Sequence, residues 1–216
     1  MAPGRLFILH ICYNIFNYTH TDRRMQINDT PNLPNWFLSQ QHNFENNLTK
    51  FKGMPNLKFL QIGAYTGDAS VWLLDNILTD PSSTLTDIDT WEGSDELEHK
   101  AISFSDVQAY YTKRTKKYNN LLSIRSKSEY ALPNLKETYD FIYIDGDHTA
   151  KGVRDDAESA WGILKPNGVL AFDDYMWGQD LPPYLTPKPA IDSFLDKYTG
   201  SYELLTKEYQ VWLVKK

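Results

Sequence analysis

Short apolar runs alternate with amphipathic stretches along the chain from Leu57 onward. In the amphipathic stretches apolar side chains recur at three- and four-residue steps, which indicates helices with one buried face. The apolar runs predict strands at 57–62, 84–89, 121–125, 141–145 and 169–172. The amphipathic stretches predict helices at 68–78, 104–117, 128–135, 150–164 and 190–198. This alternation is typical of strand–helix units on a parallel sheet, and runs at 202–206 and 209–214 predict a terminal hairpin.

Proline and glycine mark where several of these elements end. Asp80-Pro81 ends the first helix, because the residue before a proline avoids helical backbone angles. KPNG at 165–168 should end a later helix and turn the chain, and Gly200 should end the last helix. We expect a main domain over 57–216, and over 1–56 an N-terminal extension with a helical cover. The Asn-rich stretch 26–56 should form that helical or irregular cover over the sheet.

The apolar stretch LFILHICYNIF follows Arg5 and superficially resembles a signal peptide. His10 and Asn14 interrupt it, and no small-residue cleavage site follows. It is also too short to span a bilayer. A docking helix or a strand-like extension fits better, and translation starting at Met25 is a further interpretation that stays open.

Composition narrows the classes of function. The 216 residues suit one well-buried domain, and the net charge of −6 disfavours nucleic acid or an anionic membrane as partner. Cys12 is the single cysteine, which excludes a disulfide framework and a cysteine zinc cluster. We therefore expect a cytoplasmic protein with a small-molecule partner, and homo-oligomerisation stays open.

The first predicted strand leads into a glycine-bracketed turn that opens a helix. Gly63 and Gly67 have three residues between them, and the third glycine of the dinucleotide fingerprint is absent. A structural turn explains such a pair almost as well as a ligand loop does. Asp89, about twenty residues farther on and at a strand end, can accept hydrogen bonds from ribose hydroxyls, which favours a nucleoside-containing cofactor. Asp87 lies deeper in the same strand.

Together, three segments between Phe59 and Tyr175 resemble the class I S-adenosylmethionine-dependent methyltransferases. FLQIGAYTGDAS is similar to their first cofactor motif, and TDIDTWEGSDE to their acidic second motif. YDFIYIDGDHTAKGVRDDAESAWGILKPNGVLAFDDY resembles the fourth and fifth strands of a small-molecule O-methyltransferase subgroup. Gln61 departs from the family, which more often has an acid there. The resemblance implies a Rossmann-like fold with a mostly parallel seven-stranded sheet, a C-terminal antiparallel hairpin and helices on both faces.

The resemblance also implies the cofactor contacts. The methionine moiety would pass the turn after the first strand, Asp89 would bind the ribose, and the adenine would lie just after the third strand. Trp91 packs on cofactor or substrate in this interpretation, or is an ordinary buried aromatic. The residues so assigned are Gln61, Gly63, Ala64, Tyr65, Thr66, Gly67, Asp89, Trp91, Ser126, Lys127, Ser128 and Asp145.

Acids also close the fourth and fifth strands, which should be neighbours in a right-handed arrangement. Asp145, Asp173 and Asp174 together suit a hard divalent cation such as Mg²⁺. The subgroup includes catechol and macrocin O-methyltransferases, and resemblance to its D-x-x-H element implies that His148 is the general base beside Asp145.

Plainer interpretations of these polar residues also stay open. Asp147 and Thr149 would then only cap a helix, His148 would bond a backbone carbonyl, and one of the paired acids would point away. Two charged groups predict solvated helix faces: Arg154, Asp155 and Asp156, and the basic helix end formed by Lys113, Arg114, Lys116 and Lys117.

Three functions remain from the sequence alone. The first is a metal-assisted O-methyltransferase acting on a small hydroxylated molecule such as a sugar, glycoside or polyol. The second keeps the cofactor without the metal, and the third is a non-catalytic cofactor-binding module of the same fold. The acceptor would lie against the N-terminal cover and the loops 91–104 and 175–189, with Trp177, Tyr184 and Pro182 as lining candidates or as parts of a lid.

Overall fold

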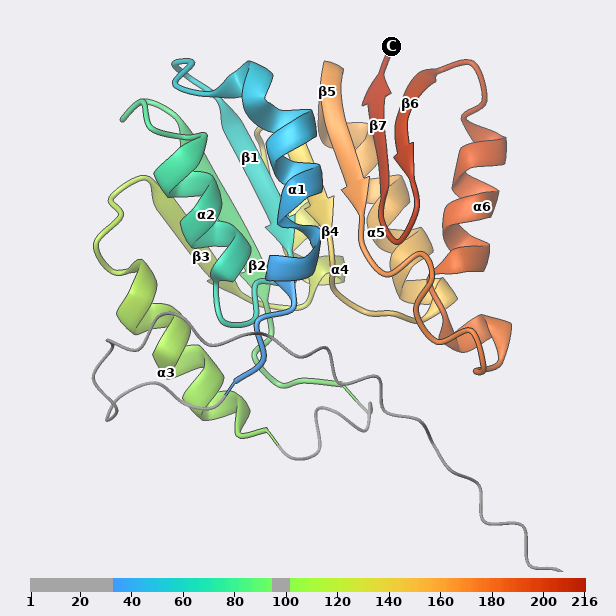
Figure 1. The fold of residues 1–216 in the computed structure, drawn as a ribbon, viewed down its shortest axis with the longest axis horizontal. Coiled ribbons are helices and arrows are strands. Elements are labelled where there is room, and N and C mark those ends of the chain that lie inside the picture. The colour runs from blue at the N-terminus through green and yellow to red at the C-terminus, as the bar shows by residue number, and fades with distance from the viewer. Residues whose placement is uncertain (1–32, 95–101) are drawn as a thin grey trace, which may run out of the picture. The chain divides into compact units, whose positions relative to one another are not determined.

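The computed structural model describes residues 33–94 and 102–216, all within one unit, Pro31–Lys216. A seven-stranded sheet forms its centre, in the order β3-β2-β1-β4-β5-β7-β6 (Figure 1). The strands are β1 Lys58–Ile62, β2 Thr84–Asp89, β3 Leu121–Arg125, β4 Tyr139–Ile144, β5 Leu164–Phe172, β6 Tyr202–Lys207 and β7 Val211–Lys215. The first five run parallel, and β7 lies antiparallel between β5 and β6. The predicted fold class is confirmed.

Helices cover both faces of this sheet (Figure 1). They are α1 Phe37–Leu48, α2 Asp68–Asn76, α3 Phe104–Thr115, α4 Ser128–Ala131, α5 Ala150–Ile163 and α6 Lys188–Lys197, with short 3-10 turns at Thr49–Phe51, Leu132–Asn134 and Pro183–Leu185. Side chains alternate along each strand. Phe141 and Tyr143 therefore pack with α1 and α2, while Ile142 and Ile144 pack with α5 and α6.

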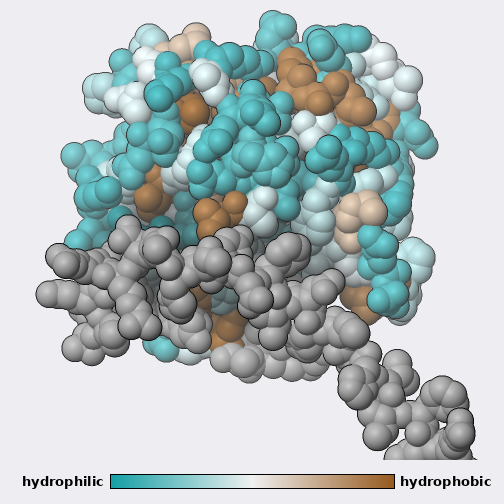
Figure 2. Space-filling view, viewed as in Figure 1, coloured by the Kyte–Doolittle hydropathy of each residue, from teal (hydrophilic) through white to brown (hydrophobic). Residues whose placement is uncertain are grey.

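Within 26–56, where a helical or irregular cover is predicted, the structure has the helix α1, which packs on the sheet. Phe44 is fully buried and makes edge contacts with Phe141, Tyr143 and Trp212. The described surface on this side of the sheet is mainly hydrophilic, with separate hydrophobic patches (Figure 2). Among the described helices, none is long and apolar enough to cross a bilayer. The interpretations of the apolar leader and of Met25 as a start concern residues outside the described part of the chain.

The turn predicted at KPNG needs correction. The helix α5 ends at Ile163 as expected, but β5 begins at once with Leu164 and includes KPNG. Leu164 pairs with Tyr139 and Val169 with Phe141, so β5 advances five residues while β4 advances two. The three extra residues make the register irregular, as a bulge does, and the two strands pair on both sides of them.

Asp156 is a second correction, because it does not lie on a solvated helix face. It is 4% exposed, whereas Arg154 and Asp155 beside it face solvent more openly. Its position follows from helical periodicity, since Val153, Asp156 and Ala157 occupy one stripe that faces the sheet. Burial raises the pKa of Asp156 to about 6, although a hydrogen bond from Ser128 opposes the rise.

Candidate active site

The turn after β1 passes very close to the end of β4. Gly63 has a φ of +86°, and a Cβ there would lie 1.7 Å from the carbonyl oxygen of Asp145. The Asp145 amide donates to the carbonyl of Ile62 at 2.8 Å, which ties the two strand ends together. The glycine is therefore required by backbone packing, and the turn and Asp145 lie at one place on the sheet edge.

Asp89 holds the turn that follows Gly63. Its Oδ2 accepts hydrogen bonds from the amides of Ala64 and Tyr65 at 2.7 and 2.8 Å, and its Oδ1 accepts one from the Trp91 amide at 2.6 Å. A carboxylate has about four acceptor positions, so these three bonds leave about one for another donor. The proposed ribose contact stays a prediction.

Trp91 is a buried aromatic side chain in this structure. It is 3% exposed, packs on Tyr111 with ring centroids 4.8 Å apart, and donates from Nε1 to the carbonyl of Tyr65 at 2.9 Å. The plainer interpretation of Trp91 therefore agrees with its surroundings, while contact with a cofactor stays a prediction.

Ser126 and Lys127, predicted near the adenine, line a hollow at the ends of β2 and β3. Its volume is about 270 Å³, and its other described lining residues are Thr90, Glu92, Arg125 and Tyr130. That volume lies below the usual range for a whole drug-sized ligand, so the hollow suits one part of a larger molecule.

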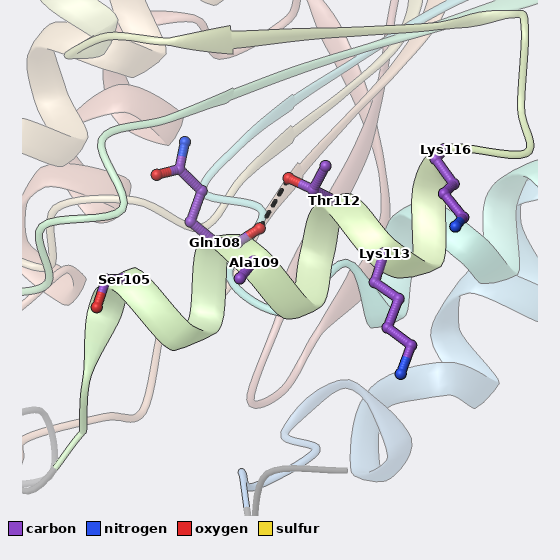
Figure 3. A pocket seen from close by; sticks show the side chains of 6 residues that line it. All are labelled: Ser105, Gln108, Ala109, Thr112, Lys113 and Lys116. Carbon is purple, nitrogen blue, oxygen red and sulfur yellow. Dashed lines mark hydrogen bonds between the residues drawn. The ribbon is translucent and has the colours of Figure 1, made fainter. Parts of the chain in front are cut away.

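A second hollow, of about 460 Å³, runs along α3 (Figure 3). Its described lining residues are Ser105, Gln108, Ala109, Thr112, Lys113 and Lys116, all on that one helix. Of the predicted basic helix end, Lys113, Lys116 and Lys117 are exposed, but Arg114 pairs with Asp68 at 2.6 Å. This surface does not include the residues of the strand ends.

Asp145, His148 and Asp174 converge at the ends of β4 and β5. His148 Nε2 lies 3.0 Å from Asp174 Oδ2 and 4.0 Å from Asp145 Oδ1. Thr149 caps α5 by accepting the Gly152 amide at 3.1 Å, and Asp147 accepts the Thr149 amide at 2.8 Å. Capping thus accounts for Asp147 and Thr149, and leaves His148 facing the two acids.

The side chain of Asp173 makes different contacts from that of Asp174. Its Oδ2 accepts a hydrogen bond from the Tyr143 hydroxyl, and its Oδ1 accepts the Asp174 amide at 2.8 Å. Asp174 instead accepts the Tyr209 hydroxyl on Oδ1 at 2.9 Å. The structure therefore brings two of the three predicted ligands together with His148, and Asp173 lies outside that group.

Two of the acids at these strand ends, Asp145 and Asp173, have raised pKa values. Burial, followed by the charge of Asp174, raises the pKa of Asp145 to about 6, while the nearby His148 opposes the rise. Burial and the charges of Asp145 and Asp174 hold the pKa of Asp173 well above its usual range. A nearby positive charge would stabilise the ionised form of such carboxylates and lower their pKa values.

The same group has the composition of a cation site. One ligand atom from each of Asp145, His148 and Asp174 can be chosen so that all three lie within 4.8 Å of one another. Carboxylate oxygens suit Mg²⁺ and Mn²⁺, and an imidazole nitrogen suits several other divalent metals. The residues therefore fit the divalent cation that the sequence predicts.

Asp87 is a buried acid that the strand-end group does not include. It accepts hydrogen bonds from Ser70 and Tyr111 at 2.6 and 2.8 Å, and burial raises its pKa to about 7. Because the folded protein then binds this proton more tightly than the unfolded chain does, the free energy of unfolding should fall as pH rises from about 4 to about 7.

Asp87→Asn should remove that part of the pH dependence. We expect the stability difference between pH 5 and pH 8, measured by urea unfolding, to shrink by about 1–4 kcal/mol at 1.36 kcal/mol per pKa unit. Asp145 and Asp156 contribute with the same sign and remain in the variant. Asp155→Asn, a change at a more exposed acid, is the control, and an unchanged difference in Asp87→Asn would contradict the assignment.

Several solved structures that resemble this chain are described as methyltransferases. The O-methyltransferase TomG from Streptomyces achromogenes, described as involved in tomaymycin synthesis and in complex with S-adenosylmethionine, has 15% identity and a TM-score of 0.61, covering 82% of this chain and 80% of its own. The O-methyltransferase NovP has 17% identity and a TM-score of 0.64 over 83% and 80%. A putative rRNA-methylase from Clostridium thermocellum has 12% identity and a TM-score of 0.61 over 82% and 94%. At such identities the likeness shows the fold alone.

Sequence comparison gives the family more directly. No curated protein matches this chain. A family model described as a methyltransferase domain matches residues 60–175, from β1 to just beyond β5, and so includes both the turn at Gly63 and the acids at Asp145 and Asp174. Since this match covers more than half of the chain, the protein belongs to that methyltransferase domain family.

Proposed function

We propose that this methyltransferase uses S-adenosylmethionine to methylate a hydroxyl group of a small molecule, assisted by a divalent cation. The observation that carries the proposal is the convergence of Asp145, His148 and Asp174 at the strand ends. The backbone of Asp145 also contacts the turn at Gly63, where the predicted cofactor loop begins. Cofactor and acceptor would thus meet at one edge of the sheet, as ligands do in open α/β folds.

Each residue has a distinct role in this proposal. When bound, S-adenosylmethionine supplies the methyl group, and a divalent cation supplies positive charge that eases the loss of a hydroxyl proton. Asp145 and Asp174 would hold the cation. His148 would take the acceptor's proton on Nε2 while the acceptor oxygen takes the methyl group, a task that suits an imidazole near neutral pH.

The acceptor is proposed to be a small molecule rather than nucleic acid. The net charge of −6 opposes a phosphate backbone. On the loop after β5, Trp177 contacts the His148 ring at 4.8 Å between centroids, and Met176, Leu181 and Tyr184 are exposed. A hydroxylated acceptor with an apolar face would suit this loop.

The location proposed for the protein is the cytoplasm, because a single cysteine favours a reducing compartment.

Cofactor binding is the first test. Isothermal titration should show that S-adenosylmethionine and S-adenosylhomocysteine bind the protein and that the reduced nicotinamides do not. The positioned turn after β1 and the hollow at Ser126 are the reasons for this expectation. Absence of binding for both adenosyl compounds would remove the proposal.

His148→Ala should slow methyl transfer by roughly 10²–10⁴-fold, the usual contribution of a general base. The affinities for Mn²⁺ and S-adenosylmethionine, measured by titration, should change by only a few fold. His42→Ala is the matched control, because His42 is an exposed histidine on α1. If Mn²⁺ affinity falls as far in His148→Ala as in Asp174→Ala, His148 is a ligand instead of the base.

A metal-independent methyltransferase is a second candidate, favoured by one contact. The 3.0 Å distance between His148 Nε2 and Asp174 Oδ2 allows these two groups to bond each other directly, with no cation between them. In that case a chelator would leave the rate unchanged. Loss of activity on chelation, restored by Mg²⁺ or Mn²⁺, would favour the first candidate.

A further inference from the structure

Asp173 and Asp174 are consecutive, yet they make different contacts. Both oxygens of Asp173 already accept hydrogen bonds, one from Tyr143 and one from the amide of Asp174 itself. The Asp174 carboxylate lies instead beside His148 and Tyr209. Asp173 is thus bound to the backbone of the residue whose side chain enters the site.

The backbone of Asp174 is in an uncommon conformation. Its φ is +59°, in the left-handed region that costs a residue with a side chain about 1–2 kcal/mol, although aspartate tolerates it better than most. The bond from the Asp174 amide to Asp173 Oδ1, at 2.8 Å, holds this turn on one side. The Trp177 amide holds it on the other by donating to the Asp174 carbonyl at 2.9 Å.

A chain of buried hydrogen bonds fixes the direction of the Tyr143 hydroxyl. The indole of Trp212 can only donate, so the Gln210 atom 2.9 Å from its Nε1 must be the oxygen. Asn43 on α1 donates to the same oxygen at 3.1 Å. Gln210 therefore turns Nε2 to the Tyr143 oxygen at 3.3 Å, and the Tyr143 proton is left for Asp173.

The members of this chain are well protected from water. Gln210 and Trp212 are fully buried, Tyr143 is 2% exposed and Asn43 is 4% exposed. Buried polar groups with satisfied partners are rigid, and loss of one partner leaves the others unpaired. The chain thus links α1, β7 and β4 to the backbone at the site.

We infer that Asp173 is a positioning residue, not a cation ligand, and that Tyr143 and Gln210 hold it so that it fixes Asp174 beside His148. The inference rests on the proposed function for its significance, because it says how one of the proposed ligands is placed. It assigns Tyr143, Gln210 and Asn43 a part in the site. Gln210 and Asn43 act through Tyr143, which also interacts with the side chain of Asp145.

Tyr143→Phe tests the inference, since it removes one hydroxyl and keeps the ring that packs on Phe44. In metal-free protein, hydrogen exchange of the Asp174 amide, followed by NMR, should become at least about tenfold faster. Mn²⁺ affinity should fall by about 10–100-fold, the usual effect of losing a residue that orients a ligand. The affinity for S-adenosylmethionine should change by less than about twofold, since Tyr143 supports Asp173 and not the turn after β1.

Tyr139→Phe is the matched control, because Tyr139 is equally buried on the same strand and its hydroxyl bonds Thr86. It should change neither the exchange nor the Mn²⁺ affinity. Asp173→Asn gives a second test, since asparagine can still accept the Asp174 amide. It should lose no more Mn²⁺ affinity than Tyr143→Phe does, whereas Asp174→Asn should lose nearly all of it.

Two results would overturn the inference. One is an Asp174 amide that exchanges at the same rate in Tyr143→Phe as in the unaltered protein. The other is loss of Mn²⁺ binding in Asp173→Asn as complete as in Asp174→Asn. If the unaltered protein binds no Mn²⁺, the metal part of the proposed function fails, and the exchange comparison in metal-free protein still decides the inference.

Discussion

Asp145→Ala and Asp174→Ala are each expected to lower Mn²⁺ affinity by at least about 100-fold, the upper end of what loss of a mere orienting residue costs. Each change removes one of the two carboxylates that face His148, and a cation that loses a charged oxygen ligand has little protein left to hold it. Mg²⁺-dependent methyl transfer should be abolished in both variants. Electron paramagnetic resonance of free Mn²⁺ measures the affinity, and methyl transfer is followed on any acceptor found in a panel of hydroxylated small molecules.

Asp155→Ala is the matched control for these two changes. Asp155 lies on α5, away from the strand ends, and is more exposed than Asp145 and Asp174. The change removes one negative charge, as the two site changes do, at an acid that pairs with Lys151 and Arg154. Its Mn²⁺ affinity and turnover should equal those of the unaltered protein. Unchanged Mn²⁺ affinity in both site variants, together with activity that resists a chelator, would instead support the metal-independent candidate.

The sequence predicted which residues share the edge of the candidate site, because the fold follows simple patterns of apolar and polar residues. Apolar runs predicted five parallel strands, and ligands collect at the carboxyl ends of such strands. The turn at Gly63, Asp145 and the acids after β5 therefore lie at one edge, as expected. The three- and four-residue spacing of apolar side chains predicted the buried face of α5. The same spacing places Asp156 on that face, so its burial could also have been predicted.

Side-chain directions at the strand ends could not be predicted in the same way. Asp173 and Asp174 look equivalent in the sequence. The positive φ of Asp174 directs its side chain to His148, whereas the side chain of Asp173 bonds Tyr143. Positive φ at Tyr65 and Trp91 likewise accompanies the three amide bonds to Asp89. Such angles at residues other than glycine depend on tertiary contacts, and so does the bulge at KPNG.

Gly63→Ala is expected to destabilise the folded protein by at least about 3 kcal/mol, toward the upper end for one substitution. The added methyl group would lie 1.7 Å from the carbonyl oxygen of Asp145 and 2.5 Å from its carbonyl carbon, where neither contact is with a movable side chain. The positive φ adds strain that only glycine avoids. Relief would require β1 and β4 to separate at their last pair, Ile62 and Ile144, so the turn and Asp145 would shift together.

Urea unfolding measures this loss, and titration with S-adenosylmethionine should show binding weakened as well. Gly162→Ala is the matched control, because Gly162 lies in α5 with no atom within 4 Å of an added Cβ. Alanine is preferred to glycine inside a helix, so this variant should be more stable by roughly 0.5–1 kcal/mol and should bind the cofactor normally. If Gly63→Ala were as stable as Gly162→Ala, the two strand ends could not be as close as the structure has them. The turn after β1, where the cofactor is proposed to bind, would then not be coupled to Asp145. The reason for expecting methyl donor and acceptor to meet at this edge would be lost as well.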